Sequence, residues 1–338
     1  MKAIGVTQFL PAGHPDCFAE CYLDAAAPGA RDLQVRVQAV SVNPVDCKIR
    51  ASVQGRLMTP KILGWDAAGV VTSVGKGVTL FQPGDEVYYA GSISQPGCNS
   101  EYHLVDERIV GRKPSCLSFE EAAALPLTTI TAWEALFERL AIKSPAHLKE
   151  TILIIGGAGG VGSMAIQLAK SAGVRVVTTA SREVSKQWCF QMGADYVIDH
   201  RESLATGLKK ISVNTVDYIL CLHNTDYYWQ PMADVIKPQG KICAVVSAAG
   251  PLDLNVFKNK SVTFAWEFMF TKAKYETANM ISQHELLNHV AEMVEQRRVK
   301  STMTEHLGRL TATNLANAHE RLESRRMVGK LVLSGILV

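Results

Sequence analysis

The 338-residue sequence lacks the features that would place it in a membrane or on nucleic acid. No uninterrupted apolar stretch reaches about 18 residues, so no membrane-spanning helix is predicted. The net charge is only +3, and no basic run indicates a nucleic-acid partner. Internal repeats and low-complexity tracts are also missing. With 47% hydrophobic and 20% charged residues, the sequence is typical of a globular protein.

Export signals and paired cysteines are missing as well. Residues 1–6 are typical of a first β-strand and lack the charged-then-apolar build of a signal peptide. The eight cysteines are scattered without a C-x-x-C pair. We therefore expect reduced thiols in a cytoplasmic protein.

The most informative segment is a glycine-rich turn that follows the apolar run 151–155 and opens a helix at about 164–172. Gly157, Gly159 and Gly162 fit G-x-G-x-x-G in the strand–turn–helix setting that a dinucleotide fingerprint requires. The first glycine permits a tight turn, the second lets the backbone approach a pyrophosphate, and the third lets helix and strand pack closely. A glycine-rich connection without a ligand is the alternative. The predicted cofactor-binding backbone is Gly157, Ala158, Gly159, Gly160, Val161 and Gly162.

The next strand, 174–179, indicates which dinucleotide is bound. NAD sites usually carry a carboxylate about 20 residues past the glycines, on the ribose 2′-OH. This strand instead runs into Ser181 and Arg182, with Lys186 one helical turn later. A hydroxyl and cations suit a 2′-phosphate, so NADP(H) is favoured over NAD(H). The alternative for Arg182 and Lys186 is a solvated helix start.

The length favours two domains. Short strands are predicted at 1–7, 34–42, 69–74 and 86–89, separated by Gly and Pro, which suggests a barrel or partly open sandwich. Helices follow, one after a capping box formed by Ser118 and Glu121, and a second over 128–140.

The remainder of the chain alternates strands and helices, which predicts an α/β fold with a doubly wound parallel sheet. A last helix at 283–296 precedes a strand at 329–333 that returns to the first domain. The predicted domains are 1–125 with 300–338, and 126–299. The six predicted strands of the sheet are 151–155, 174–179, 196–198, 216–221, 240–246 and 262–270.

Five segments together resemble the medium-chain dehydrogenase/reductase superfamily: 41–46, 63–71, 81–87, 123–133 and the glycine loop. The resemblance is strongest to its zinc-independent quinone oxidoreductase (zeta-crystallin-like) branch, in the set called zinc-type alcohol dehydrogenase-like. It implies a GroES-like catalytic domain, a Rossmann domain, and substrate and nicotinamide meeting between them. It also implies a homodimer, formed through an edge strand within 264–270.

Zinc alcohol dehydrogenases of this superfamily hold their catalytic metal with Cys, His and Cys. The resemblance places Asn43, Trp65 (beside Asp66) and Leu127 at those positions, and the structural-zinc lobe is missing. We therefore expect no zinc. The expected activity is metal-free hydride transfer from NADPH to a quinone or α,β-unsaturated carbonyl. The alternatives are an NADPH-binding structural or RNA-binding protein and, with less support, a zinc alcohol dehydrogenase.

The resemblance also suggests catalytic roles for three residues. Asn43 is a candidate hydrogen-bond donor, Asp46 would orient the backbone or a cofactor ribose, and Thr131 would contact the nicotinamide. Their structural alternatives are a turn amide, a helix N-cap and a helix residue facing the sheet.

Further candidates follow from the same resemblance. His200 would lie near the adenine, and Lys330 would close over the cofactor. Trp65, Trp266 and Phe268 would line the substrate pocket, with the protein core as the alternative for each. The possible proton donors Tyr88, Tyr89 and Tyr102 are not ranked by the sequence, and a solvent proton would also serve.

Overall fold

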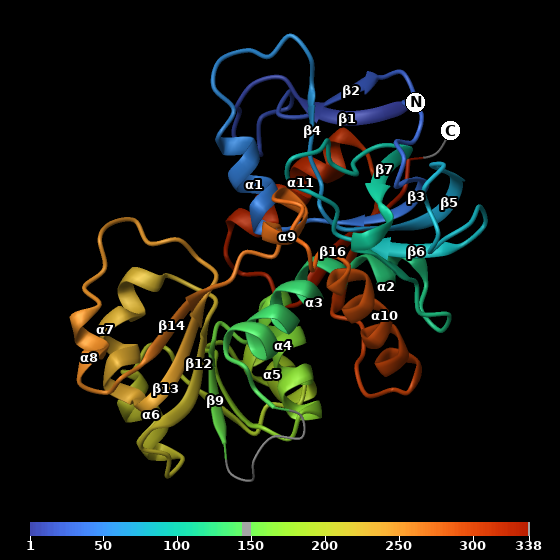
Figure 1. Cartoon of the computed structure of the whole chain (residues 1–338). Helices are drawn as coiled ribbons and strands as arrows, with labels where there is room; N and C mark the ends of the chain where they lie inside the picture. The colour runs from blue at the N-terminus through green and yellow to red at the C-terminus, as the bar shows by residue number, and fades with distance from the viewer. Residues whose placement is uncertain (144–149, 337–338) are drawn as a thin grey trace. The chain divides into compact units, whose positions relative to one another are not determined.

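The computed structural model describes residues 1–143 and 150–336. Its chain forms two compact units, one of Met1–Ile130 with Phe270–Val338 and one of Thr131–Met269 (Figure 1). Residues 337–338 of the predicted C-terminal return lie outside the described residues. None of the described helices is both long and apolar enough to cross a bilayer.

The first unit is mainly β and contains two sheets. The smaller has the strand order β2-β1-β4, and the larger has the order β15-β16-β3-β5-β6-β8, with β7 also paired to β3. Its strands are β1 (Lys2–Val6), β2 (Ala19–Tyr22), β3 (Asp32–Ser41), β4 (Lys61–Ile62), β5 (Ala67–Val74), β6 (Glu86–Tyr89), β7 (Tyr102–Asp106), β8 (Val110–Arg112), β15 (Met303–Arg309) and β16 (Lys330–Ser334).

The predicted return of the C-terminus is seen within this unit. Strand β16 pairs with β3 antiparallel, with Val332 opposite Ser41. The helices around these sheets are α1 (Pro44–Ala51), α2 (Phe119–Ala123), α9 (Thr271–Lys274), α10 (Ser282–Glu295) and α11 (Ala312–Glu323), and η1 (Glu107–Ile109) is a short 3-10 turn. Ser118 caps α2 with the predicted capping box to Glu121.

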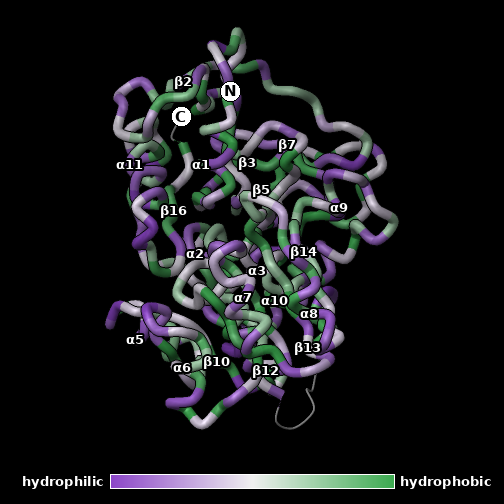
Figure 2. The backbone as a smooth tube through the Cα atoms, turned by 90° about the vertical axis from the view of Figure 1, so that its left-hand side faces the viewer, coloured by the Kyte–Doolittle hydropathy of each residue, from purple (hydrophilic) through white to green (hydrophobic). Residues whose placement is uncertain are grey.

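The second unit confirms the doubly wound α/β prediction. Its sheet has the order β11-β10-β9-β12-β13-β14, and every neighbouring pair is parallel. The strands are largely apolar (Figure 2), as strands covered on both faces must be. They are β9 (Thr151–Ile155), β10 (Arg175–Thr179), β11 (Tyr196–Ile198), β12 (Val216–Cys221), β13 (Ile236–Ala244) and β14 (Thr263–Trp266), with helices α4 (Gly160–Ser171), α5 (Glu183–Gln191), α6 (Leu204–Lys210), α7 (Thr225–Val235) and α8 (Asn255–Lys258).

The strand predicted over 240–246 is the longer β13, Ile236–Ala244, and two other predicted elements differ more from the structure. The helix predicted over 128–140 is α3 (Pro126–Trp133) followed by a π-helix, η2 (Glu134–Arg139). The strand predicted over 262–270 ends at Trp266, because the chain leaves the sheet at Glu267, whose carboxylate pairs with Arg139. The alternation of apolar residues in this segment does not predict an ion pair such as that between Glu267 and Arg139.

Candidate functional site

The glycine-rich turn has the geometry of a nucleotide-binding loop. It leaves the carboxyl end of β9, with Gly156 at φ +95°, and opens helix α4. A Cβ on Gly157 would lie 2.8 Å from the Thr178 Cβ, and one on Gly162 would lie 2.6 Å from the Gly157 Cα. Only glycine fits at these two positions, because the turn packs this closely on β10 and on itself.

Gly159 is different, because it borders open space. A Cβ there would meet only the Gly156 carbonyl oxygen, at 3.7 Å. Gly159 is the N-cap of the 12-residue helix α4 and provides no side chain to bond its first amides. Unpaired N–H groups at a helix N-terminus attract an anion. The loop therefore fits the pyrophosphate of a dinucleotide, with Gly159 leaving the room that a side chain would fill.

Cationic side chains lie beyond the carboxyl end of β10. Ser181 and Arg182 are half-buried, and Arg182 is the N-cap of α5. The Lys186 Nζ lies 3.6 Å from the Asp199 Oδ2, in the turn after β11. Asp199 also forms a bidentate pair with Arg201 at 2.5 and 2.9 Å, which holds the pKa of Asp199 well below its usual range. This carboxylate orients Lys186, a contact between α5 and the turn after β11 that no local sequence pattern predicts.

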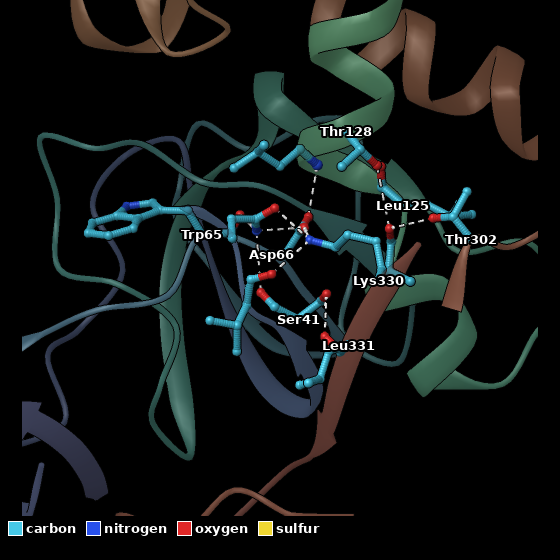
Figure 3. Close-up of polar contacts among 12 residues, drawn as sticks. Ser41, Trp65, Asp66, Leu125, Thr128, Thr302, Lys330 and Leu331 are labelled. Carbon is cyan, nitrogen blue, oxygen red and sulfur yellow. Dashed lines mark hydrogen bonds and ion pairs between the residues drawn. The ribbon is translucent and has the colours of Figure 1, made fainter. Parts of the chain in front are cut away.

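Lys330 begins β16 and lies almost fully buried in the first unit (Figure 3). Its Nζ donates to the Asn43 Oδ1 at 2.5 Å, to the Asp66 Oδ2 at 2.9 Å and to the Val42 carbonyl oxygen at 3.2 Å. An ammonium group has three hydrogens, and all three are directed at protein atoms. Lys330 therefore has no hydrogen left for a cofactor phosphate, which argues against its predicted cofactor contact.

Asn43 and Asp66 complete this buried cluster. The Asn43 Nδ2 donates to the Asp66 Oδ2 at 2.9 Å, and the Leu127 amide donates to the Asp66 Oδ1 at 2.8 Å. Burial raises the pKa of Asp66, and the Lys330 ammonium opposes that rise. Both ends of the Asn43 amide are thus engaged within the protein. This arrangement favours the structural alternative for Asn43, a turn amide, over a donor to substrate.

Asp46 is a second buried carboxyl group next to the cluster. Its Oδ2 accepts the Asn43 backbone N–H at 2.6 Å, as the N3 residue of the capping box of α1. Its Oδ1 has no partner among the described residues. Burial raises the pKa of Asp46 to about 7. A proton on Asp46 leaves one carboxylate, Asp66, facing one ammonium, Lys330, so that the buried charges balance.

The three positions that the resemblance assigns to zinc ligands meet at this cluster. Asn43 supplies an amide, Leu127 supplies a backbone N–H to Asp66, and Trp65 supplies its carbonyl, 3.4 Å from the Asn43 Nδ2. Thiolate and imidazole ligands are missing from these positions, and the Lys330 ammonium already pairs with Asp66. This donor set does not fit zinc. Nowhere in 1–143 and 150–336 do three His, Cys, Asp or Glu side chains group as metal ligands.

The predicted aromatic residues lie in different environments. Trp65 is buried in the first unit, with its Nε1 donating to the Ser92 carbonyl at 3.0 Å and its ring edge-on to Phe270. These contacts favour the alternative for Trp65, a place in the protein core, over a place in the substrate pocket. In the second unit, Trp266 and Phe268 are 47% and 45% exposed, while Thr131 is buried.

The candidate proton donors and the predicted adenine contact are also placed. The Tyr88 hydroxyl donates to the Leu287 carbonyl at 2.6 Å, and the Tyr89 hydroxyl lies 3.2 Å from the His103 Nδ1. Both are buried and committed to neighbours, whereas Tyr102 is half-buried. His200 is exposed immediately after Asp199. These contacts do not favour Tyr88 or Tyr89 as the proton donor, because both hydroxyl groups are already engaged by other protein groups.

Comparisons with known proteins agree with this architecture. Residues 29–126 match the alcohol dehydrogenase GroES-like domain, and residues 192–333 match a family described as zinc-binding dehydrogenase. The chain is 44% identical to a zinc-type alcohol dehydrogenase-like protein of Staphylococcus epidermidis, over 99% of both chains. It is also 31% identical to the quinone oxidoreductase of Lama guanicoe, over 82% of this chain and 83% of the relative.

Two solved structures extend the likeness. A Rhizobium etli protein assigned to the zinc-dependent alcohol dehydrogenases superposes with a TM-score of 0.95 at 44% identity, covering 100% of this chain and 99% of that one. The Escherichia coli quinone oxidoreductase complexed with NADPH superposes with a TM-score of 0.83 at 26% identity, covering 99% of this chain and 100% of that one.

Proposed function

Because the chain belongs to the medium-chain dehydrogenase/reductase superfamily and is an oxidoreductase, we propose that it transfers hydride from NADPH to a quinone or α,β-unsaturated carbonyl without metal. The observation that carries this proposal is the buried Lys330–Asp66 pair, which contacts the positions that the resemblance assigns to zinc ligands. An ammonium with every hydrogen engaged by protein atoms has none left to stabilise charge that develops on a substrate. The acceptor must therefore disperse its own developing charge, as quinones and enones do.

The nicotinamide, when bound, supplies the hydride, and the protein binds and orients it. The α4 N-terminus and Gly159 would hold the pyrophosphate, and Ser181, Arg182 and Lys186 would hold the 2′-phosphate. In the first unit, Asn43 and Asp46 would keep the turn before α1 in one conformation. That is a positioning role, exerted through the backbone.

The test is oxidation of NADPH and NADH against 1,4-benzoquinone, 9,10-phenanthrenequinone, an alkenal and an enone, with EDTA present throughout. We expect turnover with NADPH that EDTA does not change. Loss of activity in EDTA, with recovery on added zinc, would contradict the metal-free proposal. Tight NADPH binding without turnover on any acceptor would instead support the non-catalytic alternative.

We further propose that the protein forms a homodimer through β14, the edge strand of the parallel sheet. An exposed apolar edge strand promotes aggregation unless something covers it, and Trp266 and Phe268 are both about half exposed beside this strand. Light scattering of wild-type protein and of Trp266→Lys tests this. We expect the wild-type protein to be a dimer and Trp266→Lys to be a monomer. A monomeric wild type at micromolar concentration would contradict the proposal.

A further inference from the structure

The second unit contains a buried pair of carboxyl groups that hydride transfer does not use directly. One of them, Glu134, opens the π-helix η2, and Arg139 ends it. The Leu140 amide bonds the Ala135 carbonyl, five residues back, at 2.9 Å. This wider turn places Glu134 and Arg139 on the same side of the helix.

The other carboxyl group belongs to Glu267, the first residue after β14. Its amide donates to the Ala244 carbonyl at 2.9 Å, and its Oε2 accepts the Arg139 Nε–H at 2.8 Å. Glu134 and Glu267 both face the Arg139 guanidinium, and both side chains are fully buried. Two ionised carboxylates beside a single guanidinium would leave one buried negative charge uncompensated. This arrangement favours a proton on one member of the pair.

The surrounding charges support one shared proton. Arg139 is the cation facing the pair, with an Nη2 4.0 Å from the Glu134 Oε2. Glu138, partly exposed, lies 4.0 Å from the same guanidinium, and the buried Cys243 thiol faces Glu267 from β13. Burial and the neighbouring Glu134 raise the pKa of Glu267 to about 9. At neutral pH the pair then carries one negative charge, which Arg139 balances.

The pair lies on the side of the sheet where the nicotinamide half of a dinucleotide would be. Ligands of open α/β sheets bind at the carboxyl ends of the strands, across the point where the strand order reverses. Here that point lies between β9 and β12, with β10 and β11 on the side of Arg182. The other half of a dinucleotide would then lie on the side of β12, β13 and β14, and Glu267 follows the carboxyl end of β14.

We propose that the Glu134–Glu267 pair holds one proton while the bound nicotinamide is reduced, and releases it when the ring is oxidised. This inference rests on the proposed function, because it concerns the proton that the same reaction consumes. Oxidation of the nicotinamide places a positive charge on the ring, and a nearby positive charge favours the ionised form of a carboxyl pair.

The stoichiometry is balanced. The acceptor takes a hydride from NADPH and one proton from the pair, giving the hydroquinone or saturated carbonyl and NADP+. The pair is left as two carboxylates beside Arg139 and the cationic ring. It regains its proton from water on the partly exposed side of Arg139 when NADP+ leaves.

Calorimetry without substrate tests this, using the intact protein titrated with NADP+ and separately with NADPH, each at pH 7.5 in phosphate and in Tris. The two buffers differ in ionisation enthalpy, so the difference in measured heat counts the protons released. We expect NADP+ to release up to one proton per site more than NADPH does. Any protonation change at the 2′-phosphate is common to both cofactors and cancels in that difference.

Variants at Glu267 and Glu134, with Glu138→Gln as the control, identify the group that releases the proton. Glu267→Gln removes the shared proton, so the difference between NADP+ and NADPH should vanish while both cofactors still bind. Glu138→Gln removes a carboxylate at the same guanidinium and should leave the difference unchanged. If Glu267→Gln fails to fold, Glu134→Gln and the infrared C=O band of a protonated carboxyl group in the wild type replace it.

The possible outcomes separate the two proposals. Two results would contradict the proposal that the pair holds a proton: equal proton release with NADP+ and NADPH in the wild type, or a difference in proton release that Glu267→Gln does not change. Neither result would contradict the proposed activity. No binding of either NADP+ or NADPH contradicts the proposed function itself.

Discussion

Replacement of Lys330 by methionine tests the buried cluster of the first unit. Methionine keeps most of the side-chain volume and removes the ammonium, so Asp66 keeps only its bonds to Asn43 and Leu127. Both members of the ion pair are buried, with side chains 4% and 0% exposed. Removing one partner of such a pair costs about 3–5 kcal/mol, since it leaves an uncompensated charge. We expect a loss of unfolding free energy in that range at pH 8.

The loss should depend on pH in a definite direction. Burial already raises the pKa of Asp66, and without Lys330 it rises further. A carboxyl group with a raised folded-state pKa lowers stability progressively as the pH rises from its unfolded pKa to its folded pKa, and the penalty is constant above that. Protonation removes the penalty as the pH falls towards the unfolded value of about 3.9. The deficit of Lys330→Met should therefore be smaller at pH 5 than at pH 8.

The assay is urea unfolding combined with hydrogen exchange resolved by peptide, because the two units need not unfold together. Peptides from α1 and β16 should lose protection, and those from β9 and β12 should not. Lys113→Met is the matched control. The Lys113 side chain is also buried, but its Nζ bonds the Pro114 and Leu117 carbonyls and the half-exposed Glu86, so its removal leaves no buried carboxylate unpaired and the expected loss is about 1–2 kcal/mol. The double variant Lys330→Met/Asp66→Asn should recover much of the stability. Equal losses for Lys330→Met and Lys113→Met, unchanged between pH 5 and 8, would refute the reasoning.

Three further predictions concern the cofactor loop and Asp46. Gly159→Val should fold normally but bind NADPH at least about tenfold more weakly (~1.4 kcal/mol), because its side chain fills the phosphate cradle; unchanged fluorescence titrations would contradict this. Arg182→Ala and Lys186→Ala should lower the NADPH-to-NADH ratio of kcat/KM by about tenfold or more, while the control Lys170→Ala, whose lysine pairs with Asp195, should not. Burial raises the pKa of Asp46 to about 7, so the unfolding free energy of the wild type should fall relative to that of Asp46→Asn as the pH rises from 4 to 7. Above pH 7 the difference between the two proteins should stay constant. A constant difference in urea unfolding between pH 4 and 7 would rule out a neutral Asp46.

The sequence was most informative where structure depends on local patterns. The parallel sheet followed from apolar runs separated by helices. Gly162 packs closely on the loop, whereas the positive φ of the turn lies at Gly156 and Gly157 is required by its contact with Thr178. The capping box of Ser118 and Glu121 was predicted, because it is a contact across three residues. The helix N-cap given as the alternative for Asp46 is wrong, since Asn43 is the N-cap of α1 and Asp46 is its N3 residue.

Contacts across long distances in the sequence were not predictable. Lys330 and Asp66 are 264 residues apart, and no periodicity records that a lysine at the start of a strand turns inward onto a carboxylate. The π-helix was missed for a similar reason. Its wide turn brings Glu134 and Arg139 together at Glu267, which lies 128 residues beyond Arg139 in the sequence.

The pairing of β16 with β3 has a consequence for biosynthesis. Residues 131–269 form a continuous segment that can begin folding as soon as it leaves the ribosome, whereas the first unit is split and must wait for its final strand. Until Lys330 has been translated, Asn43 and Asp66 have no cation to surround. A nascent chain halted ahead of that residue would hold an immature first unit beside a mature second one, and would be a natural substrate for chaperones and proteases.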